Sequence, residues 1–278
     1  MPAARVAKIA VLVLLLIGAG FFFGRACQEI NEQYQLLLSL NKDFASGVLM
    51  LLLAIALVAM AGGLVAALVR PLWIPILGFA LSALAAFFAW ELSLASGLTA
   101  LIYFAVSIPY TRGVAEALEN RLKFSVQAIS GSQSILLAGL AIAASVSVYF
   151  GYAGEIDERG FQLPPAMGDM IAEFSSAPLM AQIDARTDLT AEEREAMASQ
   201  ITEGLDQWMA SMEEMIQPYE RFIPILVAFM LFQVLAVVNT LFSWAPIVVL
   251  AVLFPILTRL GVVREITESK TVVRLVLD

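Results

Sequence analysis

Long runs without a charged residue constrain this chain more than any other feature. They cover 9–24, 44–69, 71–111 (broken only by Glu91), 124–154 and 222–258. A helix of about 20 apolar residues crosses the hydrocarbon core of a bilayer and satisfies its own backbone there. The 278 residues are 60% hydrophobic and 14% charged, whereas soluble domains are roughly 25% charged. The sequence therefore predicts an all-α integral membrane protein.

The first run predicts an N-terminal signal-anchor helix over 1–27. It lies between Lys8 and Arg25, whose long side chains can reach the two membrane surfaces. A cleavable signal peptide is the alternative, because the basic start, the apolar centre and the small residues Gly18 and Gly20 are typical of one. We expect the helix to be retained.

The region 28–150 is expected to form a first membrane unit together with one further span. As a single helix, 71–111 would be about 60 Å long, twice the thickness of the hydrocarbon core, so it must fold back, with Glu91 at the turn. An acidic residue within a membrane is a functional candidate, but at a turn that reaches water it needs no such role. The expected elements are an interfacial helix over 28–43, spans at about 44–69, 72–90, 92–109 and 127–150, and an amphipathic surface helix over 110–126.

The last uncharged run predicts a C-terminal membrane hairpin over 221–260 that turns around Asn239, Thr240 and Ser243. This gives about seven transmembrane helices, or six if the first helix is cleaved or one C-terminal limb is re-entrant. The tail, 261–278, is polar and β-branched, and it could add a strand to the sheet of another protein.

The region 151–220 is the only long segment that cannot dissolve in a bilayer. It carries 15 acidic residues against three arginines, whereas the rest of the chain carries 9 acidic residues against 13 lysines and arginines. We therefore expect an inserted acidic, Met-rich helical domain outside the membrane. Because the first helix has the most weight in the positive-inside rule, we expect a multi-pass plasma-membrane protein with this domain on the extracytoplasmic side.

Two helices are expected within this domain. Pro165 can open a short first helix, with apolar residues on one side at Met167, Met170, Ile171 and Phe174. The second helix should begin at the capping box formed by Thr190 and Glu193 and run to about Gln217, where Pro218 interrupts it.

The second helix has an apolar seam at nearly heptad spacing, opposite an acidic face. This candidate partner-docking face consists of Met197, Ile201, Leu205, Trp208, Met212, Met215 and Tyr219. The seam must be covered by the first short helix, by a protein partner or by another copy of the chain. Thioethers at Met209, Met212 and Met215 could suit Cu(I), but steps of three residues spread the sulfur atoms around a helix, so we expect no metal site.

Small polar residues in the fifth span suggest a second candidate site. Ser130, Ser134, Ala138, Ala141 and Ser145 recur at helical spacing, which predicts a smooth stripe for close helix packing. A transporter could use the same stripe for a polar membrane path, consisting of Ser130, Gln133, Ser134 and Ser145.

A weak internal repeat gives the transporter alternative some support. Residues 45–60 and 129–144 share six identities in sixteen positions, and the sequence Ile-Pro-Ile-Leu occurs at Ile74 and again at Ile223. Two inverted three-span units would resemble the architecture of many small transporters or channels. Coincidence is the competing interpretation, because Leu/Ala-rich helices resemble one another.

Catalytic chemistry has little support in the sequence. The chain has no histidine and one cysteine, Cys27, and it contains no motif for a nucleotide, cofactor or nucleic acid. We therefore expect a non-enzymatic scaffold or accessory subunit, in contact with membrane lipid, that docks a partner through its acidic helical domain. A small transporter or channel is the alternative.

Overall fold

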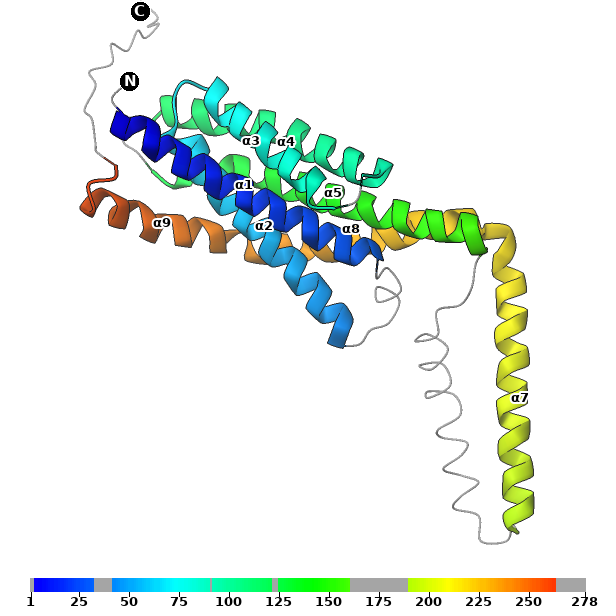
Figure 1. Ribbon diagram of the computed structural model, residues 1–278. Helices are drawn as coiled ribbons and strands as arrows, with labels where there is room; N and C mark the ends of the chain where they lie inside the picture. Colours follow the sequence, from blue (N-terminus) through cyan, green and yellow to red (C-terminus); the bar gives the residue numbers. More distant parts are fainter. Residues whose placement is uncertain (1–2, 33–41, 91, 122–124, 161–189, 264–278) are drawn as a thin grey trace, which may run out of the picture.

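The computed structural model describes residues 3–32, 42–90, 92–121, 125–160 and 190–263 (Figure 1). Every regular element within these ranges is a helix. The helices are α1 (Ala3–Glu32), α2 (Lys42–Leu68), α3 (Trp73–Phe88), α4 (Leu94–Glu119), α5 (Gln127–Arg159), α7 (Ala191–Ile216), the 3₁₀-helix η2 (Gln217–Phe222), α8 (Ile223–Phe242) and α9 (Trp244–Arg259).

Several of these helices can span a membrane, as the sequence predicts. By length and composition, the candidate spans are Ala4–Glu32, Ala45–Leu68, Leu94–Glu119, Gln127–Glu158 and Ser199–Phe242. In the last of these, the apolar part is α8. The helices α3 and α9 are also apolar but shorter. The prediction of an all-helical chain with several membrane-compatible helices is therefore confirmed.

Helix α1 is longer than the expected signal anchor. It continues past 27 into the segment expected to form a separate interfacial helix over 28–43. Arg25 lies within this helix, and its guanidinium group reaches the Gln28 side chain and the carbonyl oxygen of Ala89, at 3.5 Å from the latter. The remainder of the expected interfacial helix, 33–41, lies outside the described residues.

Helices α1 and α3 run side by side in the same direction and pack through small residues. A β-carbon on Gly24 would lie 2.7 Å from the Cα of Ala86, and one on Gly20 would collide with Ser82. The Ser82 hydroxyl donates a hydrogen bond to the carbonyl oxygen of Leu16 at 2.7 Å. Small residues four apart permit this close backbone approach in membranes. Helix α1 is therefore an integral part of the bundle.

The run 71–111 folds back on itself as α3 and α4, which pack together. Ser93 begins α4 by accepting a hydrogen bond from the backbone N–H of Ser96 at 3.1 Å. The Ser96 hydroxyl lies 3.0 Å from the Ser93 backbone nitrogen, which donates to it, so the two serines form a reciprocal cap.

The prediction of an amphipathic surface helix over 110–126 is wrong. Helix α4 continues without a break through Pro109 to Glu119, and Tyr110 and Val114 are buried in the bundle. Hydroxyl groups next to the proline stabilise the continuous helix, since the Thr111 hydroxyl donates to the carbonyl oxygen of Ser107 at 2.7 Å. Its apolar face therefore packs against protein rather than lying on a membrane surface.

The prediction of a C-terminal hairpin over 221–260 is also wrong. Only Ser243, in a helical conformation, separates α8 from α9, and α9 continues away from α8 along the bundle (Figure 1). The hydroxyls of Thr240 and Ser243 bond within the helix, to the carbonyl oxygens of Ala236 at 2.7 Å and Thr240 at 3.1 Å. The two hydroxyl groups that suggested a turn are thus satisfied inside one interrupted helix, whereas the amide nitrogen of Asn239 is buried without a hydrogen-bond partner.

The two ends of the described chain lie at the same end of the bundle (Figure 1). The Lys8 ammonium group at the start of α1 donates hydrogen bonds to the carbonyl oxygens of Gly261 at 3.0 Å and Val262 at 2.9 Å, just after α9. The β-branched tail lies outside the described residues from 264 onward.

Candidate functional site: the amphipathic helix α7

Helix α7 begins at the capping box that the sequence predicts. The Thr190 backbone N–H and hydroxyl both donate to one carboxylate oxygen of Glu193, at 2.8 and 2.9 Å, and the Glu193 backbone N–H donates to the Thr190 hydroxyl at 3.3 Å. The hydrogen bond from the Thr190 backbone, followed by that from its side chain, lowers the pKa of Glu193. The helix ends at Ile216, where the chain enters η2 with Pro218 in its first turn.

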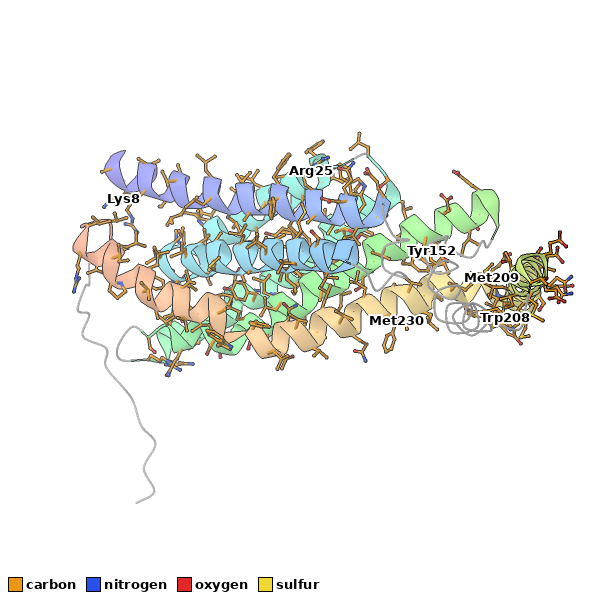
Figure 2. The ribbon with its side chains drawn as sticks, turned by 90° about the horizontal axis from the view of Figure 1, so that it is seen from below. Lys8, Arg25, Tyr152, Trp208, Met209 and Met230 are labelled. Carbon is orange, nitrogen blue, oxygen red and sulfur yellow. The ribbon has the colours of Figure 1, made fainter. Side chains whose placement is uncertain are left out.

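Helix α7 stands apart from the bundle. It extends crosswise to the bundle helices at the end where α5 finishes and α8 starts (Figure 1), and both views agree on this arrangement (Figure 2). Among the described elements, α7 packs principally against η2, the short helix that follows it. The first short helix expected in this domain, with Met167 and Phe174, lies outside the described residues.

The predicted partner-docking face forms one apolar stripe along α7 and η2, called here the Met/Trp stripe. Trp208 is 48% exposed and Met215 is 71% exposed. Met197 and Tyr219 are also exposed, whereas Ile201, Leu205 and Met212 are half-buried. The face opposite the stripe is acidic, with exposed carboxylates at Glu192, Glu203 and Glu214.

The apolar surface continues beyond α7. Phe222, Ile225, Leu226, Phe229 and Met230 are all at least half exposed. Phe222 ends η2, and the other four lie in the first turns of α8. The guanidinium group of Arg221 lies 4.9 Å from the centre of the Phe222 ring, a cation–π distance. An aromatic ring beside a basic group is typical of the boundary between lipid and water.

A two-helix stalk connects α7 to the bundle. The last turns of α5 pack against the first turns of α8, with Tyr152 and Ile156 buried on α5 and Val227 and Leu231 buried on α8. Helix α5 continues past the boundary expected at 150 because this apolar seam continues. Since α5 also contacts η2, its final turns lie level with the foot of α7.

The predicted polar path residues do not share one surface. Ser130 is half-buried and Ser134 is exposed, whereas Gln133 and Ser145 are buried. The Ser145 hydroxyl donates within its own helix, to the carbonyl oxygen of Ala141 at 2.9 Å. Gln133 is 1% exposed, and neither atom of its amide has a hydrogen-bond partner.

Other small residues of α5 face the neighbouring helix α4. A β-carbon on Gly139 would lie 2.7 Å from the Cβ of Val106, and the Thr99 hydroxyl donates to the carbonyl oxygen of Ala143 at 3.3 Å. The close-packed side of α5 is therefore offset from the stripe predicted from the serine spacing. The spacing of the serines correctly predicted a helix rich in small residues, but it did not predict which side of that helix packs against other helices.

Sequence reasoning missed a cluster of aromatic and hydroxyl groups in the centre of the bundle. The Ser82 and Tyr103 hydroxyls share a hydrogen bond of 2.8 Å. The Phe79 ring lies edge-on to the rings of Tyr103 and Tyr110, with centroids 6.2 and 5.9 Å apart. These residues come from two helices, α3 and α4, so no pattern within one helix could have brought them together.

The described residues offer no grouping of three or more His, Cys, Asp or Glu side chains that could hold a metal ion. Cys27, the one cysteine of the chain, is buried. Helix α7, with its Met/Trp stripe and acidic face, is thus the most distinctive candidate site. Comparisons with protein-family models, with curated proteins and with solved structures find no match to this chain.

Proposed function

We propose that the protein is a non-enzymatic multi-pass membrane scaffold or accessory subunit that docks a protein partner through α7. One observation carries the proposal: α7 extends away from the bundle with an apolar stripe on one side and exposed carboxylates on the other. A helix that only stabilised the bundle would bury its apolar side against it. The acidic face offers a partner a charged surface, and the Met/Trp stripe needs an apolar cover that the bundle does not supply.

The proposed topology has six crossings. They are α1, α2, α3, α4, α5 and the pair α8 and α9, which cross together. The number six also occurs in the predicted fold, but there it follows from a cleaved first helix or a re-entrant C-terminal limb, whereas here the two C-terminal limbs cross once together. It places α7 on the opposite side of the membrane from the start of α1 and the end of α9.

The distribution of charge orients this topology. The side that holds the start of α1 carries the basic residues Arg5, Lys8, Arg70, Arg112, Arg121 and Arg259. The other side carries fewer basic residues next to its spans, namely Arg25, Lys42, Arg159 and Arg221, and they lie beside Glu29, Glu32 and Glu155. Under the positive-inside rule, the first side is cytoplasmic and α7 is extracytoplasmic at the plasma membrane.

Site-specific photo-crosslinking in native membranes tests the docking proposal. A photoreactive amino acid at Glu203 reports on the acidic face, one at Trp208 reports on the stripe, and one at Leu101, exposed on α4, serves as the membrane control. We expect one recurrent protein adduct from position 203 or 208 and not from 101. Its formation from position 203 should be lost in a Glu192→Lys/Glu214→Lys variant that keeps its melting temperature. If positions 203 and 208 both crosslinked only to lipid or to other copies of the chain, the proposal would be contradicted.

The alternative function, a small transporter built from two inverted three-span units, has less support. Helices α3 and α4 turn back on each other, whereas α8 and α9 continue in one direction, so the matching motifs at Ile74 and Ile223 begin different arrangements. The buried amide of Gln133 is the single observation that favours a polar path. Solute flux into sealed vesicles, abolished by Gln133→Leu, would support this alternative.

A further inference from the structure

We propose that the Met/Trp stripe of α7 is seated on the lipid surface of the membrane that holds the bundle, so that the acidic face alone points toward water. The inference rests on the six-crossing topology proposed above and identifies lipid as the apolar cover of the stripe. It leaves the acidic face as the surface for the partner of the proposed function.

The direction of α7 is the first argument. In the proposed topology the bundle helices run along the membrane normal. Helix α7 runs crosswise to them in both views (Figures 1 and 2). A helix crosswise to the spans lies parallel to the membrane plane. One face of such a helix points toward lipid and the opposite face points toward water.

The level of α7 is the second argument. Large apolar side chains of α8 are exposed from its first turn, and Phe229 is 58% exposed. Just before these residues, Arg221 lies over the exposed ring of Phe222, and a basic group beside an aromatic ring is typical of the boundary between lipid and water. The acidic residues Glu155, Asp157 and Glu158 occur where α5 contacts η2, and they place water at the same level. The foot of α7 therefore lies at the boundary between hydrocarbon and water.

The pattern of side chains on α7 is the third argument. In the heptad register of the stripe, the flanking positions hold Thr202, Met209 and Ile216 on one side and Gly204 and Ser211 on the other. Helices that pair with one another usually carry charges at these flanks, where interhelical ion pairs set the choice of partner. Here the flanks are uncharged, which widens the apolar side as an interfacial helix requires.

Trp208 and Tyr219 fit this assignment, because tryptophan and tyrosine are enriched where hydrocarbon meets the headgroups. The acidic face should repel anionic lipids. We therefore expect the stripe to be seated more deeply in vesicles of phosphatidylcholine than in vesicles that contain phosphatidylglycerol.

Spin-label accessibility on the full-length reconstituted protein tests the inference. Nitroxides are placed at Met215→Cys and Trp208→Cys on the stripe and at Glu203→Cys on the acidic face as the matched control. The native Cys27 is fully buried and does not compete for labelling. In phosphatidylcholine vesicles, we expect positions 208 and 215 to favour oxygen over an aqueous nickel complex by at least threefold relative to position 203.

Two results would overturn the inference. Nickel access at positions 208 and 215 equal to that at 203 would place the stripe in water. Low access to both reagents at 208 and 215 would show that protein covers the stripe, whether a partner, a second copy or another segment of the chain. Either result leaves the proposed function to be decided by the photo-crosslinking test. Conversely, if the labels at 208 and 215 lie in lipid and position 203 gives no protein adduct, the proposed function is rejected and the inference about lipid stands.

Discussion

The backbones of α1 and α3 touch at Gly24 and Ala86: a β-carbon on Gly24 would lie 2.7 Å from the Cα of Ala86. No side chain separates the two helices at this point. Since van der Waals packing rather than hydrophobic burial drives helix association within lipid, such a contact contributes directly to the stability of the bundle.

Gly24→Ala should therefore destabilise the protein. The added methyl group has no space against backbone atoms, and such overpacking typically costs about 1–3 kcal/mol. Thermal unfolding in detergent would measure the loss. The matched control is Gly18→Ala on the same helix, where a β-carbon would have no neighbour within 4 Å. The control should be neutral or gain up to about 1 kcal/mol from helix propensity, and equal effects of the two substitutions would argue against the close contact.

Gln133→Leu should stabilise the protein. Both polar atoms of the Gln133 amide are buried without a partner, and an unsatisfied buried group costs about 1–3 kcal/mol that an apolar side chain of similar size avoids. Unfolding in detergent should shift to a higher temperature. Ser145→Ala on the same helix is the control, because it removes a satisfied hydroxyl and should have little effect or lower the temperature slightly. A strong destabilisation by Gln133→Leu would mean that the amide binds a polar group, as a transport path would require.

The start of α7 should loosen in acid. The pKa of Glu193 is lowered in the folded protein. The stabilisation from this carboxylate is therefore fully present above the ordinary glutamate pKa of about 4.3, and it is lost as the pH falls through the lower pKa of the folded state. Amide hydrogen exchange near Thr190, corrected for the intrinsic rate, would show faster opening below about pH 4. In Glu193→Gln the pH dependence of this opening should disappear, and its persistence would assign the effect to another group.

Lys8→Met should loosen the end of α9. The substitution removes the two hydrogen bonds to the carbonyl oxygens of Gly261 and Val262. Because these bonds are exposed, the effect on global stability should be small, about 1 kcal/mol or less. Hydrogen exchange of the amides at 256–263 should increase locally. Arg5→Met, on the same helix end, is the charge-matched control and should leave these amides unchanged.

The sequence predicted the features that depend on local chemistry. The capping box at Thr190 and the interruption near Pro218 mark the two ends of α7, because hydrogen bonding at a helix start and the missing N–H of proline act within a few residues. The uncharged runs likewise predicted membrane-compatible helices. Their lengths did not predict how often each run crosses, because a long run can turn back or continue as a kinked helix.

The errors concern choices that depend on tertiary contacts. Asn239, Thr240 and Ser243 resemble a turn, but in a helix the hydroxyls can bond to carbonyl oxygens one turn earlier. The face of α4 around Val114 resembles a surface-seeking helix, but neighbouring helices bury it. For the same reason the serine spacing in α5 selected Ser130 and Ser134, which do not face the centre of the bundle, and missed Ser82 and Tyr103, which meet only in the fold.

If α8 and α9 cross the membrane once together, as proposed above, this single passage has a consequence for access to the molecule. Because one passage separates α7 from the chain end that follows Arg259, a protease or impermeant label added to one side of intact cells should reach one of these regions and spare the other.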